Sequence, residues 1–200
     1  MPKIVDHERR RREIAMLTLD VMRAVGIENA SIRGIAQRGG ISMGVLTHYF
    51  KTKDDLVVFT FRWLADRSYA QLDTLIEDCK PGLDSLETAI EAMFPKTSEQ
   101  AALALWMSLW DRAVRNPRFA REHRNYYRRW RKYIRKFLTD AVKLQQVPRD
   151  LNIATATDLI VAAADGLWLA MTLEPRRFSK MQRRILLEEL IENMTRRSNT

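Results

Sequence analysis

The residues best suited to chemistry lie between Ile41 and Phe50, where small or polar residues occupy half of ten consecutive positions. Gly44 leaves room for a surface to approach the backbone, and the hydroxyl, imidazole and phenol groups can donate hydrogen bonds to phosphate oxygens. A methionine or a threonine methyl can contact base edges. We therefore predict DNA contacts in this segment from Ser42, Met43, Gly44, Thr47, His48 and Tyr49.

These residues are positioned by a predicted helix-turn-helix. Ser31 is a suitable N-cap for a short helix over Ile32–Arg38, and two consecutive glycines form a tight turn before a second helix that Ser42 begins. In this motif the second helix presents its first residues to the major groove. We expect Val45 and Leu46 to point inward, and Ser31 and Arg33 to contact phosphates. Ser31 and Ser42 could instead act only as caps.

Long helices are predicted around this motif. Five prolines at positions 81, 95, 117, 148 and 175 mark breaks between them, and no period-2 alternation predicts a strand. We predict an all-α chain with a helix-turn-helix domain of three helices at 1–55 and an effector-binding and dimerisation domain at 56–200. The expected nine helices are 6–25, 32–38, 42–50, 53–79, 84–94, 98–115, 118–145, 151–173 and 180–196.

The segment from Ser31 to Leu56 resembles the N-terminal signature of TetR-family transcriptional regulators. The Ile35-Ala36 pair, the Gly-Ile-Ser turn, the Tyr-Phe pair and Lys53 followed by Leu56 all fall in step with it. The resemblance implies a homodimer that binds a palindromic operator as a repressor and is released by a small effector. It also implies a phosphate contact by Lys53. The chain departs from the pattern at Thr47, where many members carry a tyrosine.

A second basic segment is harder to interpret. The chain has 34 basic and 25 acidic residues and a formal net charge of +9. Residues 1–53 hold ten basic and five acidic residues, whereas residues 112–136 hold eleven basic residues and one acidic residue. Apolar residues of 119–137 recur every three or four positions, which is typical of an amphipathic helix with a solvated basic face. The alternatives are an anionic effector site, auxiliary DNA contacts, and pairing with acidic residues of the chain.

Aromatic residues beside carboxylates indicate what the C-terminal domain could bind. Trp106 and Trp110 are one turn apart with Asp111 beside them, and Asp165 and Trp168 are one turn apart. Aromatic faces and a carboxylate suit a quaternary ammonium cation, although large aromatics at helical spacing are also common in cores. The motifs around them resemble the choline-responsive repressors of glycine-betaine synthesis, which implies choline or betaine aldehyde as effector. The predicted ligand residues are Trp106, Trp110, Asp111, Tyr127, Trp130, Asp165 and Trp168.

The last two predicted helices suit dimerisation. A small-residue face permits close helix approach, and an apolar stripe follows on the final helix, so two helices from each subunit would form a four-helix bundle. The same residues could instead fill the core of one subunit. The predicted dimerisation residues are Ala162, Ala163, Gly166, Ala170, Leu187, Leu190, Ile191 and Met194.

Other classes of protein are disfavoured. The three histidines have no metal-ligand spacing and no nucleotide fingerprint occurs, so we expect neither an enzyme, nor a cofactor, nor a metal site. One cysteine, no signal sequence and no long apolar run predict a cytoplasmic protein without a membrane partner. Two alternatives to the choline-responsive repressor remain: a TetR-family regulator of an anionic or amphipathic effector, and a constitutive architectural DNA-binding protein.

Overall fold

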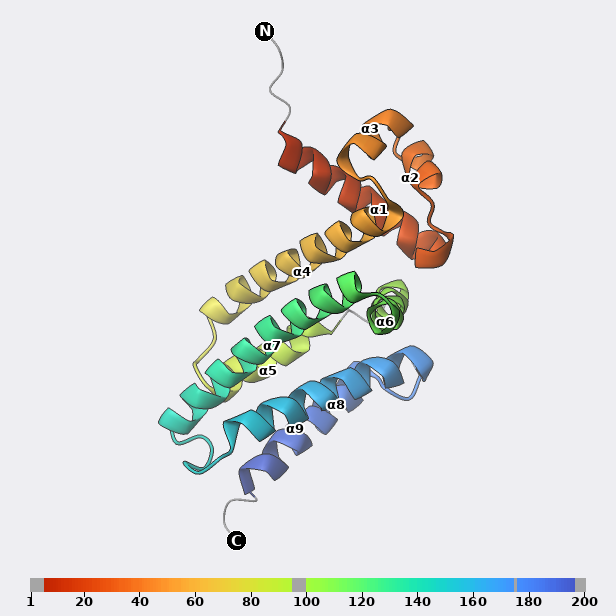
Figure 1. The fold of residues 1–200 in the computed structure, drawn as a ribbon. Helices are drawn as coiled ribbons and strands as arrows, with labels where there is room; N and C mark the ends of the chain where they lie inside the picture. Colours follow the sequence, from red (N-terminus) through yellow and green to blue (C-terminus); the bar gives the residue numbers. More distant parts are fainter. Residues whose placement is uncertain (1–5, 95–99, 175, 197–200) are drawn as a thin grey trace. The chain divides into compact units, whose positions relative to one another are not determined.

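The computed structural model describes residues 6–94, 100–174 and 176–196, with the backbone alone at 100–104, 180 and 194–196. The described residues form nine helices and no strand, which confirms the all-α prediction (Figure 1). The helices are α1 (His7–Asn29), α2 (Ile32–Arg38), α3 (Met43–Tyr49), α4 (Lys53–Glu77), α5 (Leu83–Met93), α6 (Gln100–Arg115), α7 (Pro117–Lys143), α8 (Ile153–Leu173) and α9 (Lys180–Arg196).

Short-range signals set the ends of the first helices. The Ser31 hydroxyl accepts a hydrogen bond from the Gly34 amide at 3.0 Å, and the Ser42 hydroxyl accepts one from the Val45 amide at 3.3 Å. Both satisfy amides that a helix start leaves without partners. Gly26 interrupts α1 with a φ of 79°, a backbone conformation that strongly favours glycine. The break predicted there is confirmed, although one further turn follows it.

The chain divides into two units, each with its own core. Unit 1 comprises residues 1–68 and 104–123, and unit 2 comprises residues 69–103 and 124–200. In this division the first part of α4, most of α6 and the first turns of α7 group with the helix-turn-helix. The core of unit 1 draws on α1 to α4 and on Leu105, Leu109 and Phe119.

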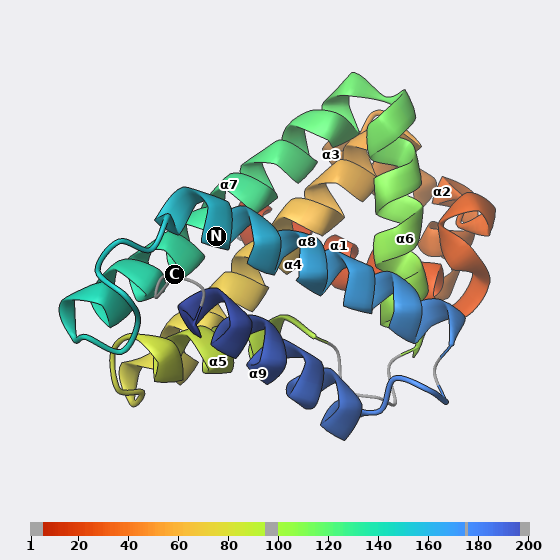
Figure 2. The same cartoon turned by 90° about the horizontal axis from the view of Figure 1, so that it is seen from below.

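The core of unit 2 lies among the last turns of α4, α5, the second part of α7, α8 and α9. Figure 2 shows α8 and α9 side by side. The face of α8 that includes Ile160, Ala164 and Leu167 is buried in this core. By length and composition alone α8 is apolar enough to cross a membrane, with a mean hydropathy of 1.4, a property that it shares with the core helices of many soluble proteins.

Candidate nucleic-acid interface and effector site

The helix-turn-helix is built as the sequence predicts. In Figure 1 the short helices α2 and α3 lie next to each other beside α1. Ile35 and Ala36 of α2 and Leu46 of α3 are buried against each other and against α1, and Leu46 is completely buried. These contacts fix the angle of α3. Its remaining residues are therefore presented as a rigid surface.

The exposed surface of α3 is more apolar than predicted. Val45 does not point inward, because one turn of helix cannot bury both Val45 and Leu46 against the same neighbours, and 39% of its surface is exposed. Met43 is 44% exposed, and Ser42, Gly44, Thr47 and His48 are also exposed. No atom lies within 4 Å of a Cβ built at Gly44. The tip of α3 therefore offers two apolar side chains that suit thymine methyl groups.

Two further predicted contacts lie on α2 and near its start. Ser31 and Arg33 are both exposed. The Ser31 hydroxyl already accepts from the Gly34 amide but still has a proton to donate. The capping and phosphate-binding roles of this serine are compatible.

Thr47 and Tyr49 are more constrained than their neighbours. The Thr47 hydroxyl donates back to the Met43 carbonyl oxygen at 2.9 Å. The Tyr49 ring is partly buried against the core and stands edge-on to His48, with ring centroids 5.2 Å apart, and His7 of α1 lies 5.7 Å from Tyr49. His7 therefore lies beside His48 and Tyr49, two of the predicted DNA contacts. Helix periodicity in the sequence did not indicate this contact.

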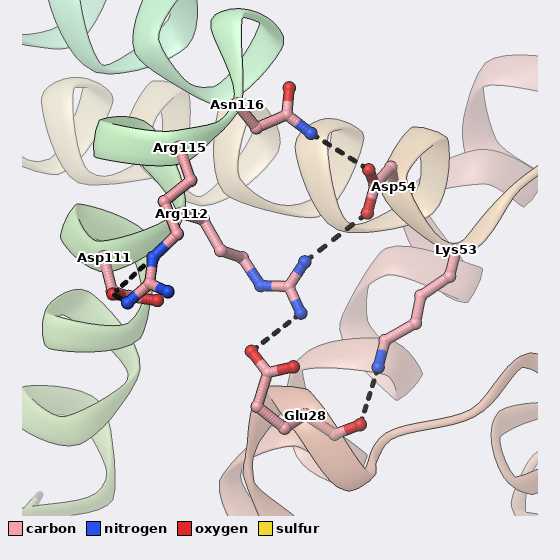
Figure 3. Close-up of polar contacts among 7 residues, drawn as sticks. All are labelled: Glu28, Lys53, Asp54, Asp111, Arg112, Arg115 and Asn116. Carbon is pink, nitrogen blue, oxygen red and sulfur yellow. Dashed lines mark hydrogen bonds and ion pairs between the residues drawn. The ribbon is translucent and has the colours of Figure 1, made fainter.

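Lys53 takes part in a polar junction at the start of α4 (Figure 3). Its ammonium donates to the Glu28 carbonyl oxygen at 2.8 Å, and two of its protons stay available to other acceptors. Burial and the nearby Arg112 guanidinium lower the pKa of Lys53, and the carboxylates of Glu28 and Asp54 partly offset this. The predicted phosphate contact therefore lies beside acidic groups that the sequence analysis did not assign.

The basic segment 112–136 divides into paired and unpaired cations. Ion pairs engage Arg112, Arg115, Arg118, Arg131 and Lys136, while Arg129 lies over the Tyr69 ring. Five exposed residues of α7 have no ion pair within the described part of the chain, and they are Arg121, Arg124, Arg128, Lys132 and Arg135. Pairing with the chain's own acids therefore accounts for about half of the segment.

Three predicted effector residues belong to unit 1. Trp106 is partly buried against the core, with its ring 5.9 Å from that of Phe61 on α4. Trp110 is also partly buried. Asp111 is exposed and accepts from the Arg115 guanidinium at 2.5 Å. This carboxylate already has a cation, so it is a weaker candidate for a ligand than the tryptophans.

The other predicted effector residues cluster in unit 2. The Tyr127 hydroxyl donates to the Asp165 carboxylate at 2.6 Å, and the Tyr127 and Trp130 side chains are buried. Trp168, one turn after Asp165, stacks on Phe94 with ring centroids 5.9 Å apart. Burial raises the pKa of Asp165, opposed by the Tyr127 hydrogen bond and by Arg131. A carboxylate held this way by a neutral donor among aromatic rings attracts a cation.

Sequence reasoning missed a buried charge in the same unit. The side chain of Arg183 on α9 is only 4% exposed, pairs with Glu91 at 2.7 Å, and lies 4.5 Å from the centre of the Phe94 ring. The signal was present, because Arg183 is four residues before Leu187 and eight before Ile191, on the same face of α9. A basic residue in register with an apolar stripe is a candidate buried ion pair.

The predicted dimerisation residues are placed differently on the two helices. On α8, Ala162 and Gly166 are exposed, and Ala163 and Ala170 are half-buried. On α9, Leu187 and Ile191 fill the core of unit 2, Leu190 packs against that core, and the Met194 side chain lies outside the described residues. The large apolar side chains that the described part of α9 exposes are instead Met181, Ile185 and Leu186.

Two family models match the chain. Residues 17–58 match the model of bacterial regulatory proteins of the tetR family, and residues 82–196 match that of the BetI-type transcriptional repressor C-terminal domain. The HTH-type transcriptional regulator BetI of Cronobacter sakazakii is 31% identical over 197 residues, covering 96% of this chain and 93% of that protein. The HTH-type transcriptional regulator PksA of Bacillus subtilis is 28% identical, covering 97% and 94%.

Solved structures share the fold. A transcriptional regulator from Saccharomonospora viridis in complex with choline superimposes with a TM-score of 0.84 at 22% identity, covering 92% of this chain and 96% of that one. A regulator from Pseudomonas aeruginosa PAO1 gives a TM-score of 0.80 at 24% identity, covering 96% and 93%.

Proposed function

The chain belongs to the TetR family of bacterial regulatory proteins and carries a BetI-type repressor C-terminal domain, and on that premise we propose that a quaternary ammonium compound releases it from its operator. One observation carries the proposal. The Asp165 carboxylate lies among aromatic side chains of unit 2 with the Tyr127 hydroxyl at 2.6 Å. A trimethylammonium group would bring a second positive charge, besides that of Arg131, to this carboxylate without needing a hydrogen bond. Choline and betaine aldehyde are the candidates.

Two further points support a cation over an anion. The S. viridis regulator of the same fold is in complex with choline. The buried cation of unit 2, Arg183, is already neutralised by Glu91 at 2.7 Å, so it offers little to an anionic effector. Trp106 and Trp110 stay predicted ligand residues through their aromatic faces.

The test of the effector compares choline with its neutral isostere, 3,3-dimethyl-1-butanol. Intrinsic tryptophan fluorescence and release of operator DNA are followed in the wild type and in Asp165→Asn. We expect choline to act on the wild type, the isostere to act far more weakly, and the variant to respond at least about tenfold less. Asp150→Asn, an exposed carboxylate just before α8, is the control and should respond normally. Equal responses of both variants would overturn the proposal.

The response should depend on pH with a defined sign. Since burial raises the pKa of Asp165 in the folded protein, protons compete with the ligand at a higher pH than for an ordinary aspartate. Choline affinity should therefore fall as the pH drops through this raised pKa. The same shift makes the ionised carboxylate costly for folding above the unfolded pKa, so Asp165→Asn should raise the melting temperature at neutral pH. Calorimetric titration and thermal melts across pH check both.

We also propose a homodimer formed through α8 and α9. The residues Leu159, Ala162, Gly166, Leu169 and Leu173 recur every three or four positions along one exposed face of α8. Nothing lies within 4 Å of a Cβ built at Gly166, so packing inside the chain does not require glycine there. Glycine in a helix interior costs about 1 kcal/mol relative to alanine, and close approach of a second helix would offset that cost.

Light scattering coupled to gel filtration tests the dimer. Leu169→Glu places a charge in the centre of the proposed interface and should give monomers that lose tight operator binding, because two recognition helices must reach successive major grooves about 34 Å apart. Leu75→Glu, at an equally exposed leucine of α4, should remain dimeric. A dimeric Leu169→Glu protein would contradict the proposed face. We propose that the chain acts in the cytoplasm, where its operator DNA lies.

A further inference from the structure

The polar junction in Figure 3 joins three elements of unit 1 through charged side chains. Arg112 of α6 donates to the Glu28 carboxylate near the end of α1 at 2.8 Å and to the Asp54 carboxylate of α4 at 3.5 Å. Asn116, just after α6, donates to the other oxygen of Asp54 at 3.1 Å. Lys53 reaches the same place but contacts only the neutral Glu28 carbonyl, at 2.8 Å.

The junction holds two carboxylates, of Glu28 and Asp54, and two cations, of Lys53 and Arg112. Arg112 forms ion pairs with both carboxylates. Its side chain is 17% exposed, against 71% for Glu28 and 37% for Asp54, so the guanidinium lies beneath the carboxylates that it neutralises. Its Nε atom is buried without a hydrogen-bond partner. The two carboxylates therefore orient the guanidinium through its terminal nitrogens, and its Nε–H group makes no hydrogen bond to any described residue. The guanidinium also lies 5.6 Å from the centre of the Phe119 ring.

This arrangement determines what Lys53 can do. Without Arg112, two uncompensated carboxylates would lie beside the Lys53 ammonium, and they would capture it by ion pairing. They would also repel a DNA phosphate. With Arg112 in place, the Lys53 ammonium donates to a neutral carbonyl oxygen of Glu28 and keeps two protons for a phosphate.

We propose that Arg112 is a positioning residue for DNA binding: it occupies the carboxylates of Glu28 and Asp54 and so leaves Lys53 free to contact phosphate. This inference rests on the phosphate contact proposed for Lys53. It gives an arginine of the second basic segment a role at the DNA interface without any contact of its own with DNA.

The test measures binding to a random-sequence duplex at several salt concentrations without effector, because a phosphate contact is independent of sequence. We expect Arg112→Gln to weaken binding about fivefold and to lower the salt slope by about 0.9, as expected for one lost phosphate contact. The triple variant Arg112→Gln/Glu28→Gln/Asp54→Asn should recover most of the affinity, since neither neutral amide captures Lys53. Arg115→Gln, three residues further on α6 and paired only with Asp111, is the matched control and should bind normally.

The outcomes separate this inference from the proposed contact. If Lys53→Ala binds as the wild type does, the proposed contact is wrong and the inference is wrong with it. If Lys53→Ala is weakened but Arg112→Gln is not, only the inference is overturned. Failure of the triple variant to recover would show that Arg112 acts through packing, which also overturns it.

Thermal melts accompany each measurement. Where Arg112→Gln does not fold, Arg112→Lys replaces it, because an ammonium is a compact charge that cannot bridge both carboxylates as the guanidinium fork does. An affinity loss smaller than about fivefold, with an unchanged melting temperature, is expected. Wild-type affinity in that variant would overturn the inference.

Discussion

Ten basic residues between 1 and 53 accompany a helix whose tip is exposed, whereas eleven between 112 and 136 are spread around α6 and α7. The first segment has the smaller net charge but a defined surface, with α3 fixed by Leu46 and two apolar side chains at its tip. In the second segment, about half of the basic side chains form ion pairs with acidic residues of the same chain, such as Arg118 with Asp55 and Arg131 with Asp158. Geometry, and not the amount of charge, therefore distinguishes the DNA interface.

We expect the largest effect on DNA binding from a substitution that disturbs the orientation of α3 without changing any charge. Leu46→Ala deletes a completely buried side chain of α3 and should lower the free energy of unfolding by about 2–5 kcal/mol. DNA binding should fall with the loss of the α3 orientation. Val45→Ala, at the neighbouring exposed position, should change stability by less than about 0.5 kcal/mol. Chemical denaturation measures the stability of both variants, and DNA titration measures their affinity. If Leu46→Ala were destabilised as expected but bound DNA as tightly as the wild type, the orientation of α3 would not determine DNA binding.

Removing one charge from the first segment should have the next largest effect. Lys53→Ala should weaken binding to operator and to random DNA by a similar factor of about ten, and lower the salt slope by about 0.9. Fluorescence anisotropy across salt concentrations gives both numbers. A loss confined to the operator would mean that Lys53 reads sequence rather than backbone.

A smaller and more selective effect is expected at the tip of α3. Met43 is exposed there and suits contact with a base edge, so Met43→Ala should change the preference between operator variants by about 1 kcal/mol per affected base pair. Affinity for random DNA should stay the same. Competition between operator variants measures this, and a uniform loss on all sequences would assign Met43 to the backbone.

We expect the smallest effect on DNA binding from removing charges in residues 112–136, the segment with the larger net charge. Arg124 and Arg128 are exposed on α7 without ion pairs among the described residues. The double variant Arg124→Gln/Arg128→Gln should change DNA affinity by less than about twofold. It should also be slightly more stable, because like charges four residues apart on a helix repel. A loss as large as that of Lys53→Ala would show that α7 also binds DNA.

The parts of the fold that the sequence predicts are those set by neighbours in the chain. The caps at Ser31 and Ser42 and the break at Gly26 depend on residues three or four positions away, and all three are confirmed. Pairings between distant residues could not be predicted. Arg112 meets Glu28 across 84 residues, and a single sequence gives no register for such a contact.

The candidate site divides along the same line. Periodicity placed Asp165 and Trp168 on neighbouring turns, but the Tyr127 hydroxyl came from a helix 38 residues away. Val45 and Leu46 are adjacent and equally apolar in the sequence, and only the packing of α3 decides which one is buried. Local pattern therefore identified the residue types of the site, and tertiary contacts assigned their roles.

Helix α6 carries two tryptophans close to Arg112, and their fluorescence can report on the polar junction. Trp110 lies two residues before Arg112 on the same helix, and Trp106 packs on Phe61 of α4, the helix that begins at Lys53. A helix of 16 residues is a rod about 24 Å long, so a displacement of α6 moves its indoles and its guanidinium together. In a variant whose other three tryptophans are replaced by phenylalanine, the emission of these two would then report the state of the DNA-side junction, with no label attached.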